Sequence, residues 1–354
     1  MMSTSSSIFK VLVLGPNPAY QRVLSFDAPV QIGSVNRAAT VTEYVGGKGQ
    51  GVAKAINGWA PGTAAVSHFL GGETGKYIQD HMDGADQIVQ ETAAPTRTCT
   101  TLLAAGQDGG GTELIDPSGT VSPAELDALL SRTAQYMTQK AAAGVPVGGV
   151  ALCGTVPPGC SSLYGDFAEG VLMEQSAAVG EPLLLLDGFK GVEAVLATGR
   201  VDVLKINVDE ALAFTAASSV DAAAHRLLHD PEHAVLHRPG ALLALTDGAK
   251  PARLFCKSGG AYSISVPSIE CVNAIGAGDV CAAIFLYQLV GSNQLAIEGE
   301  DGPVDEAACA DAFAWGLAAA CARCTHELPT EFTRAEVEAM YEQIKVEGVA
   351  LKPE

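Results

Sequence analysis

Positive charge is scarce in this sequence of 354 residues. Lysine and arginine together number 21 against 40 aspartate and glutamate residues, which gives a formal net charge of -19 at pH 7. A surface of this sign repels polyanions, so we expect neither nucleic acid nor an anionic membrane as a partner. A small anionic substrate remains compatible with the acidity, because a few local cations can dominate the potential inside one pocket.

Long apolar runs and a secretion signal are also missing. No apolar segment approaches the roughly 20 residues that a membrane-spanning helix needs. Residues 1–7 are expected to form a short, flexible, Ser-rich tail, without the basic region, apolar stretch and cleavage site of a secretory signal. The nine cysteines, an odd number without framework spacing, are typical of reduced thiols. The sequence therefore predicts a cytoplasmic protein, with a short organellar targeting tail as the alternative.

What is present is a regular alternation of apolar runs and helical patterns. The continuous apolar runs, as expected for strands buried on both faces, lie at residues 8–14, 147–153, 182–187, 201–206 and 241–246. Between two of them, a capping box of Ser122 and Glu125 predicts a helix that begins at Pro123. The alternation predicts an α/β fold with a doubly wound, mainly parallel sheet and helices on both faces.

Two segments interrupt this rhythm. Residues 17–45 contain β-type segments and turns without a good helix, and residues 96–116 read as two strands joined by a Gly-rich hairpin. We expect the two segments to pack together as a small β lid. Because the sequence contains no linker-like stretch and no internal repeat, it predicts one domain over residues 8–346 that carries this lid.

The strongest chemical motif is NAIGAGD at residues 273–279, between a β-rich segment and a long apolar helix. Gly276 and Gly278 let the backbone come close to a ligand, and the first N–H groups of the helix form an anion hole. Phosphoryl transfer needs such donors, because negative charge spreads over the oxygens of the transferred group. Asp279 can accept the proton of an attacking hydroxyl. The alternative is a Gly-rich turn whose aspartate only stabilises the helix N-terminus.

A second glycine-rich motif, GGKG at residues 46–49, precedes a helical pattern that starts at Gln50. Lys48 supplies a point charge for phosphate or hydroxyl groups. The motif is not a Walker P-loop, because Gly49 follows the lysine where that motif requires Ser or Thr. A tight turn that carries a solvated lysine is the alternative interpretation.

Together and in this order, the motifs resemble those of the PfkB (ribokinase-like) carbohydrate kinases over nearly the whole chain. The similarity is greatest to the branch of 1-phosphofructokinase and tagatose-6-phosphate kinase. The segments that carry it are NPA at 17–19, GSVNR at 33–37, GGKG, TR at 96–97, TEL at 112–114, GTVPPG at 154–159, KIN at 205–207, TDG at 246–248 and GAGD. The resemblance implies a ribokinase-like three-layer α/β/α fold and an ATP-dependent carbohydrate kinase.

The resemblance also implies roles for individual residues. The catalytic base is Asp279, and the anion hole is formed by Gly276, Ala277 and Gly278. The implied ATP-binding residues are Lys205, Asn207, Thr246, Gly248, Gly276 and Gly278. The implied acceptor-binding positions are Asn17, Gln21, Gly46, Gly47, Lys48, Gly51 and Arg97. Asn207 and Glu210 match an N-x-x-E motif that acts indirectly on Mg²⁺, through the water molecules that this ion retains.

The positions expected to contact the sugar depart from the family's pattern. Gln21 stands where the phosphosugar branch has aspartate, Gly51 where it has asparagine, and Cys99 where a T-R-x-N motif ends in asparagine. Each lost partner of a buried hydroxyl can cost on the order of 1–3 kcal/mol. The residues expected to transfer the phosphoryl group therefore match the family's pattern, whereas the identity of the acceptor is left open.

Three functions follow from these observations. The first is phosphoryl transfer from ATP, with Mg²⁺, to a sugar or sugar phosphate, where Lys48 and Arg97 converge above Asp279 on a phosphate of the acceptor. The second is a kinase of a free sugar or nucleoside. The third is a catalytically weak regulatory or binding protein on the same scaffold, which the three departures favour and the intact GAGD turn opposes. A homodimer formed through the lid is a further expectation.

Overall fold

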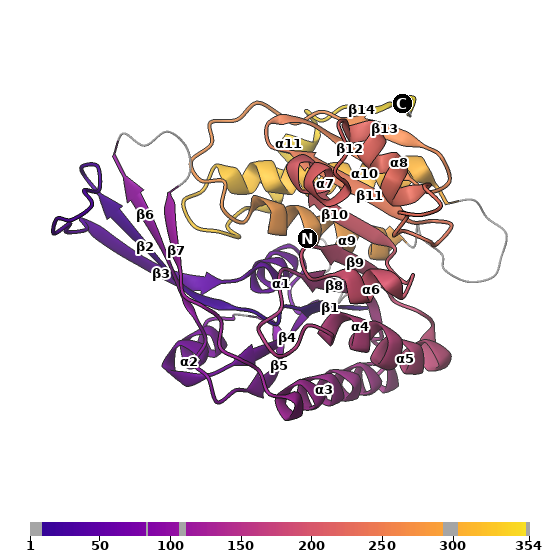
Figure 1. The fold of residues 1–354 in the computed structure, drawn as a ribbon. Helices are drawn as coiled ribbons and strands as arrows, with labels where there is room; N and C mark the ends of the chain where they lie inside the picture. The colour runs from indigo at the N-terminus through magenta and orange to yellow at the C-terminus, as the bar shows by residue number, and fades with distance from the viewer. Residues whose placement is uncertain (1–8, 83, 106–110, 293–303, 352–354) are drawn as a thin grey trace, which may run out of the picture.

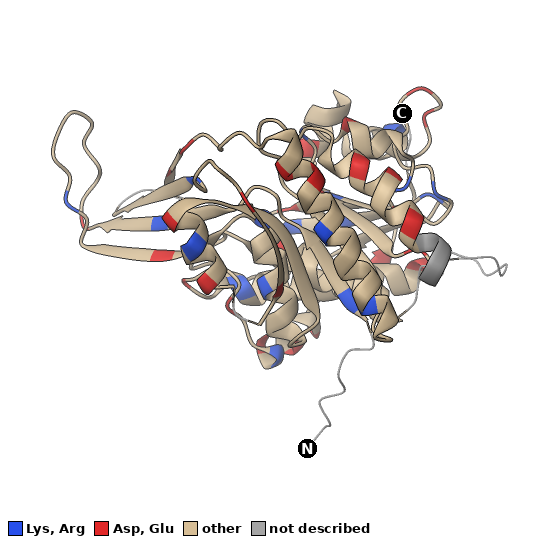
Figure 2. Ribbon diagram, turned by 90° about the horizontal axis from the view of Figure 1, so that it is seen from below, with Lys and Arg blue, Asp and Glu red and all other residues tan. Residues whose placement is uncertain are grey.

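The computed structural model describes residues 9–82, 84–105, 111–292 and 304–351 of the chain. The expected tail at 1–7 and the tip of the expected Gly-rich hairpin lie outside these residues. Among the helices described, none is long and apolar enough to cross a membrane. Acidic and basic residues are intermixed on the surface helices (Figure 2).

A ten-stranded sheet forms the centre of the molecule (Figure 1). In spatial order its strands are β14 (Val346–Gly348), β13 (Ala261–Ile264), β12 (Lys250–Cys256), β11 (Leu242–Asp247), β10 (Val203–Asn207), β9 (Leu183–Asp187), β8 (Val147–Cys153), β1 (Lys10–Leu14), β4 (Ala64–Leu70) and β5 (Asp86–Glu91). The strands from β11 to β5 are parallel, whereas β12, β13 and β14 add an antiparallel edge. The prediction of a mainly parallel sheet is confirmed.

Helices cover both faces of this sheet, because successive side chains of a strand point to opposite faces. In β1, Val11 and Val13 belong to one core and Leu12 and Leu14 to the other. The first core is covered by α1 (Lys48–Trp59), α2 (Gly72–Asp80), α9 (Ala277–Ser292), α10 (Glu306–Cys324) and α11 (Arg334–Tyr341). The second is covered by α3 (Pro123–Ala142), α4 (Leu163–Asp166), the π-helical turn η1 (Phe167–Val171), α5 (Leu172–Val179), α6 (Glu193–Ala197), α7 (Val208–Thr215) and α8 (Val220–Leu228). The predicted three-layer α/β/α arrangement is confirmed.

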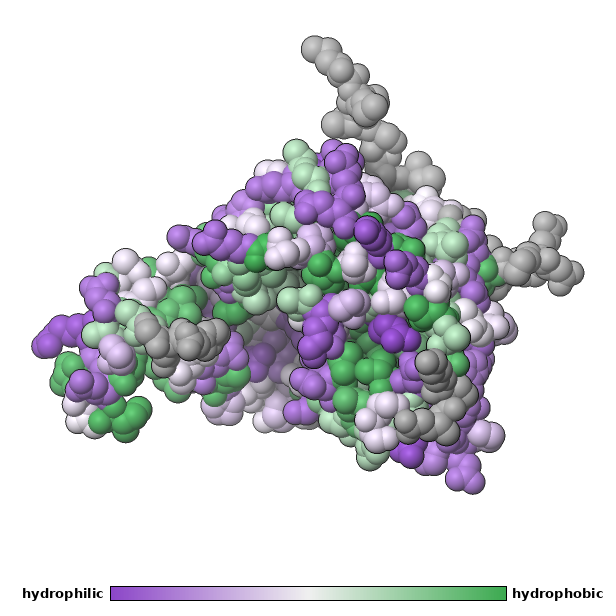
Figure 3. Space-filling model, turned by 90° about the horizontal axis from the view of Figure 1, so that it is seen from above, coloured by the Kyte–Doolittle hydropathy of each residue, from purple (hydrophilic) through white to green (hydrophobic). Residues whose placement is uncertain are grey.

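A second sheet projects from one side of the body (Figures 1 and 3). Its order is β3 (Thr40–Gly46), β2 (Ala19–Phe26), β6 (Thr98–Ala104) and β7 (Thr112–Ile115), so the segments 17–45 and 96–116 lie side by side. Gln21 on β2 pairs in register with Cys99 on β6. Two positions that depart from the family's pattern are therefore direct neighbours in one sheet.

Local signals in the sequence explain where the important helices begin. The side chain of Ser122 accepts a hydrogen bond from the N–H of Glu125, and α3 begins at Pro123 as predicted. The helix after GGKG was expected from Gln50 but begins at Lys48, with Gly47 as its N-cap at φ 111°. The helix after GAGD begins at Ala277, so Asp279 lies inside its first turn rather than before it. Both glycine-rich motifs are therefore continuous with the helices that they introduce.

Candidate active site

The residues that form the site gather where parallel strands end. Cys153, Asp187 and Asn207 are the last residues of β8, β9 and β10, and Asn17 lies in the loop after β1. The carboxyl ends of parallel strands share one edge of a sheet, and ligands bind in the crevice outside that edge. Two cavities with different linings lie there.

The first cavity has a volume of about 210 Å³ and a polar, charged lining. Of the expected acceptor-binding residues, Asn17, Lys48 and Arg97 line it. The lining residues that were not among the expected acceptor-binding positions include Gln50, Thr155, Phe189, Lys190 and Glu210. Gln21, Gly46, Gly47 and Gly51 are not among the residues that line it. The side chain of Gln21 instead donates to Oγ1 of Thr101, at 2.9 Å, inside the second sheet.

The cations of the first cavity differ in how far they are neutralised. Nζ of Lys48 lies 3.1 Å from Oδ1 of Asp187, in an ion pair. The guanidinium of Arg97 donates only to backbone oxygens, those of Asn17 at 3.1 Å and Pro18 at 3.4 Å. Lys190 is exposed, and its Nζ lies 5.3 Å above the ring of Phe189. Among the described residues, neither Arg97 nor Lys190 has a carboxylate at ion-pair distance, so their charge is available to an anion.

The second cavity is larger, about 480 Å³, and mostly apolar. Thr246, Gly248 and Gly278, three of the expected ATP-binding residues, line it together with Ala277. Its apolar wall includes Val266, Pro267, Ile269 and Leu317, and its thiols are Cys271, Cys281, Cys321 and Cys324. An apolar cavity with a few polar groups at one end is typical of a site for a planar, partly apolar ligand.

A buried ion network joins the two cavities. Nζ of Lys205 donates to the backbone oxygen of Gly278 at 2.9 Å and lies 3.6 Å from Oδ2 of Asp187. Asp187, in turn, pairs with Lys48 in the wall of the first cavity. Only 1% of the side chain of Asp187 and 4% of that of Lys205 are exposed, so water screens this network weakly. The network brings the charge of Lys205 to the GAGD turn and that of Lys48 to the wall of the first cavity.

Asp279 lies at this junction, in the first turn of α9. Burial, together with the nearby charge of Asp187, raises the pKa of its carboxyl to about 7, against the opposing effect of Lys48, Lys205 and Arg323. A carboxyl with a pKa near neutrality is suited to proton transfer at physiological pH.

The GAGD turn contains the first N–H groups of α9. Gly276 has φ 82°, a left-handed conformation that glycine adopts without strain. The N–H of Val280 donates to the oxygen of Gly276 at 3.0 Å, so the N–H groups of Gly278 and Asp279 precede the first bond of this helix. The N–H of Ala277, which was expected in the anion hole, donates to the oxygen of Ala274 at 3.2 Å.

The two residues expected near Mg²⁺ form the N-cap of α7. Oδ1 of Asn207 accepts from the N–H of Glu210 at 2.8 Å, and Oε2 of Glu210 accepts from the N–H of Asn207 at 2.9 Å. Glu210 also lines the first cavity, where oxygen ligands of this kind suit Mg²⁺. Within the described part of the chain, no cluster of three or more His, Cys, Asp or Glu could hold a metal ion. Water and phosphate oxygens would therefore have to complete the coordination of Mg²⁺ beside Glu210.

Three residues of this region were not found from the sequence. Asp187 had a usable signal, since it directly follows a buried apolar run and so ends at the carboxyl edge of the sheet. Lys190 and Arg323 had none, because a lysine in a loop and an arginine in a helix are ordinary in any sequence.

Comparison with known proteins assigns the chain to a family. Residues 17–334 match the profile of the pfkB family carbohydrate kinases. The 1-phosphofructokinase of Haloferax volcanii is 30% identical over 296 residues, which cover 78% of this chain and 83% of the relative. A tagatose-6-phosphate kinase of Staphylococcus epidermidis is 24% identical over 286 residues, with coverage of 77% and 83%.

Solved structures agree in fold. Phosphofructokinase-2 from Escherichia coli has a TM-score of 0.74 and 16% identity, and the match covers 95% of this chain and 99% of that one. Ribokinase from Giardia lamblia has a TM-score of 0.73 and 18% identity, with coverage of 95% and 99%. With the site geometry and the family match taken together, this chain belongs to the pfkB family and is a carbohydrate kinase.

Proposed function

We propose that the protein transfers the γ-phosphate of ATP to a hydroxyl of a phosphorylated sugar, with Asp279 as general base. The observation that carries the proposal is the position of the GAGD turn between two cavities of different chemistry. Gly278 lines the apolar cavity, while Lys48 in the wall of the charged cavity acts electrostatically on Asp279. A donor and an acceptor that occupy the two cavities would meet at Asp279.

ATP fits the second cavity best. Its adenine would lie against the apolar wall near Leu317, and its phosphates would extend past Thr246 and Gly248 toward Lys205. Mg²⁺, where bound near Asn207 and Glu210, supplies charge neutralisation on the phosphates. The N–H groups at the start of α9 would stabilise the charge on the transferred group.

The acceptor fits the first cavity, and its charges favour a substrate that already carries a phosphate. Arg97 and Lys190 supply the available positive charge, whereas Lys48 is paired with Asp187. This assignment replaces Lys48 by Lys190 as the partner of Arg97, and it leaves Lys48 to orient the reacting hydroxyl near Asp279. The names of the relatives, 1-phosphofructokinase and tagatose-6-phosphate kinase, agree with a phosphorylated acceptor.

In the proposed reaction, the acceptor hydroxyl gives its proton to the carboxylate of Asp279. The oxygen then bonds to the γ-phosphorus as the bond from that phosphorus to the β–γ bridging oxygen breaks, and ADP leaves with the electron pair. Positioning and electrostatic stabilisation account for most of the rate in such transfers.

We also propose that residues 8–346 act as one kinase domain and that the sheet of β2, β3, β6 and β7 is its lid. Asn17 lies two residues before β2 and Arg97 directly before β6, and both line the first cavity, so movement of this sheet would change access to it. Closure would exclude water and limit wasteful hydrolysis of ATP. Exposed apolar side chains on and beside this sheet, namely Ile32, Val35, Val41, Leu114 and Ile115, favour a homodimer formed through the lid.

The test is a screen of ATP consumption across sugar phosphates, free sugars and nucleosides, with Asp279→Asn as the control for contaminating kinases. We expect the best acceptor to be a sugar phosphate. If the best acceptor carries no phosphate, the function is that of a free-sugar or nucleoside kinase. If no acceptor is turned over above the Asp279→Asn control, a regulatory or binding role replaces the proposed one.

A further inference from the structure

Arg323 is a buried arginine whose guanidinium is only partly satisfied. It lies in the last turn of α10 and has no exposed surface. Its Nη1 donates to the backbone oxygens of Asn273 at 2.8 Å and His326 at 3.1 Å. Its Nε and Nη2 are buried and have no hydrogen-bond partner in the described chain. Unsatisfied buried donors of this kind are uncommon and require an explanation.

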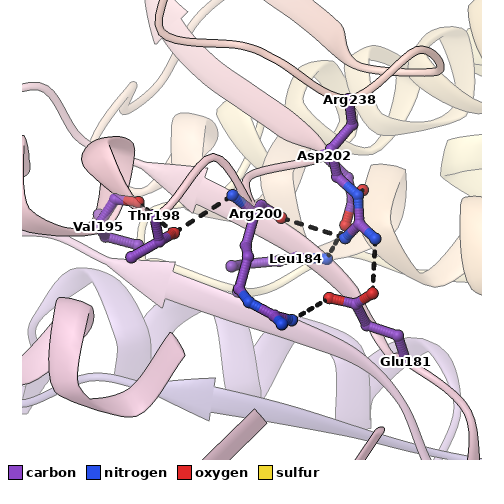
Figure 4. A network of polar contacts seen from close by, with 7 residues as sticks. All are labelled: Glu181, Leu184, Val195, Thr198, Arg200, Asp202 and Arg238. Carbon is purple, nitrogen blue, oxygen red and sulfur yellow. Dashed lines mark hydrogen bonds and ion pairs between the residues drawn. The ribbon is translucent and has the colours of Figure 1, made fainter. Parts of the chain in front are cut away.

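A partly buried arginine of the same protein, Arg238, shows the usual way to pair such a charge. Arg238 contacts two carboxylates, with Nη2 at 2.5 Å from Glu181 and Nε at 3.2 Å from Asp202 (Figure 4). Glu181 also pairs with Arg200 at 2.5 Å. Among the described residues, Arg323 has no carboxylate at ion-pair distance, although an unpaired buried charge is strongly unfavourable. Its position at the C-terminus of α10 compensates for a part of this, since the helix end carries partial negative charge.

The unpaired guanidinium lies directly behind the GAGD turn. A Cβ built on Gly276 would lie 3.9 Å from Nε of Arg323. The backbone that leads into the turn is bonded to the end of α10, because the N–H groups of Val272 and Asn273 donate to the oxygen of Cys324 at 2.8 and 3.2 Å. The bond from Arg323 to the oxygen of Asn273 strengthens the same connection. Arg323 therefore fixes the path of the segment that carries the expected anion hole.

We propose that Arg323 is a positioning residue of the transfer site, which holds the GAGD turn in place and supplies a fixed positive potential behind it. The inference rests on the proposed function. In that function, the phosphoryl group that passes from ATP to the acceptor lies on the other side of the turn and supplies the negative charge that Arg323 lacks. A charge that is already buried and oriented needs no reorganisation when negative charge develops, which is the condition for effective electrostatic stabilisation. Arg323 acts through the turn and through Asp279, and it touches neither substrate.

The charged groups around Asp279 make the inference testable by pH. They are Asp187 on β9, Lys48 on α1, Lys205 on β10 and Arg323 on α10. The titratable groups that face Arg323 itself are Asp279, Tyr44 on β3, Cys271, Cys324 and Glu331. Arg323 and the two lysines favour the ionised form of Asp279, so removal of the charge of Arg323 will raise the pKa of that carboxyl further.

Three variants of the full chain separate charge from hydrogen bonding. Arg323→Lys keeps the charge, Arg323→Gln keeps a donor for the oxygen of Asn273, and Arg323→Met keeps neither. For Met and Gln we expect kcat to fall on the order of tenfold to a hundredfold with smaller changes in KM, and the acid limb of the pH profile to move to higher pH. For Lys we expect a reduced kcat with the acid limb in its original place. Arg238→Met is the control, with a lower Tm and an unchanged kcat.

The outcomes decide between a role in transfer and a role in folding alone. If the neutral variants fold and keep kcat within about twofold, or lose kcat without a move of the acid limb, the inference is overturned. If neither neutral variant folds, an Arg323→Lys enzyme with the kcat of the parent overturns it. An Asp279→Asn enzyme that keeps its activity contradicts the proposed function itself. Arg323 variants that behave like the parent, beside an inactive Asp279→Asn, contradict this inference alone.

Discussion

Gly51 on α1 lies against the carboxylate of Asp279 on α9. A Cβ at position 51 would lie 2.7 Å from Oδ2 of Asp279 and 3.3 Å from its Cγ, so only glycine leaves room for the carboxylate in this place. The family's pattern has asparagine here. The exchange of asparagine for glycine and the position of Asp279 are therefore linked, and a change at one residue alters the other.

The first prediction concerns this contact. Gly51→Ala will force the carboxylate of Asp279 to move, and kcat will fall on the order of tenfold, because a displaced base loses its geometry for proton transfer. Gly58→Ala on the same helix is the matched control, since a Cβ there meets nothing within 4 Å. The control will stabilise α1 slightly and leave kcat unchanged. Equal kcat values for the two variants and the parent would show that the contact does not matter for turnover.

Asp279→Asn will abolish turnover and leave the fold intact. The side chain is nearly isosteric, but an amide cannot accept the proton of the acceptor hydroxyl. Circular dichroism and binding of ADP will report an intact structure, while kcat will fall below detection in the ATP-consumption assay. A purified Asp279→Asn protein that keeps most of the rate of the parent would refute the assignment of the base.

The activity will depend on pH around neutrality. The pKa of Asp279 is raised to about 7, mainly by burial, and a general base must be ionised to act. The rate will therefore rise as the pH increases through about 7, and it will be lost below that value, where the carboxyl is protonated. If the carboxyl had an ordinary pKa, the rate would stay unchanged down to about pH 4. A profile of kcat/KM that is flat between pH 5 and about 8 would therefore contradict the role of Asp279.

Much of the fold and part of the site could be predicted from the sequence. The run at 147–153 coincides with β8, and the capping box at Ser122 marks the start of α3, because both signals are local. GGKG and GAGD were recognisable for the same reason. The antiparallel edge formed by β12, β13 and β14 was not predicted, because strand pairing depends on contacts between residues that are distant in the sequence.

The charged partners at the site show the limit of sequence analysis most clearly. The expectation that Lys48 and Arg97 would share one phosphate did not include Asp187, which is 139 positions from Lys48 and neutralises it. Arg323 reaches the GAGD turn only because α10 ends beside it. No sequence motif marks either contact, because each depends on which strand ends and helix ends become neighbours in the folded chain.

Nucleotide binding in the second cavity can be tested with a thiol reagent. Among the described cysteines, only Cys271 is exposed, and it lies in the wall of the second cavity. We expect ADP to slow the alkylation of Cys271 on the order of tenfold, because the bound nucleotide would cover this thiol. Peptide mass spectrometry will assign the modified residue, and Cys271→Ser will serve as the control. Alkylation of Cys271 at the same rate with saturating ADP would place the nucleotide elsewhere.

The last prediction concerns the acceptor phosphate. Within the described residues, Arg97 donates only to backbone oxygens, and Lys190 is exposed beside Phe189, so both can bind an anion without breaking an ion pair among those residues. A charge-assisted hydrogen bond contributes about 1.5–3 kcal/mol, so Arg97→Ala and Lys190→Ala will each raise KM for the acceptor roughly tenfold to a hundredfold. The KM for ATP will change much less, because ATP is expected in the other cavity.

The matched control is Lys76→Ala, which removes an exposed lysine of α2 that pairs with Asp80 four residues later and does not line the first cavity. Its KM for both substrates will equal that of the parent. The loss of one positive charge from the surface would then not explain a higher KM in the Arg97 and Lys190 variants. Arg97→Ala with an unchanged KM, or a best acceptor without a phosphate, would favour a kinase of a free sugar or nucleoside. An effect of Arg97→Ala without an effect of Lys190→Ala would restore Lys48 as the second cation, since no other described lysine or arginine lines this cavity.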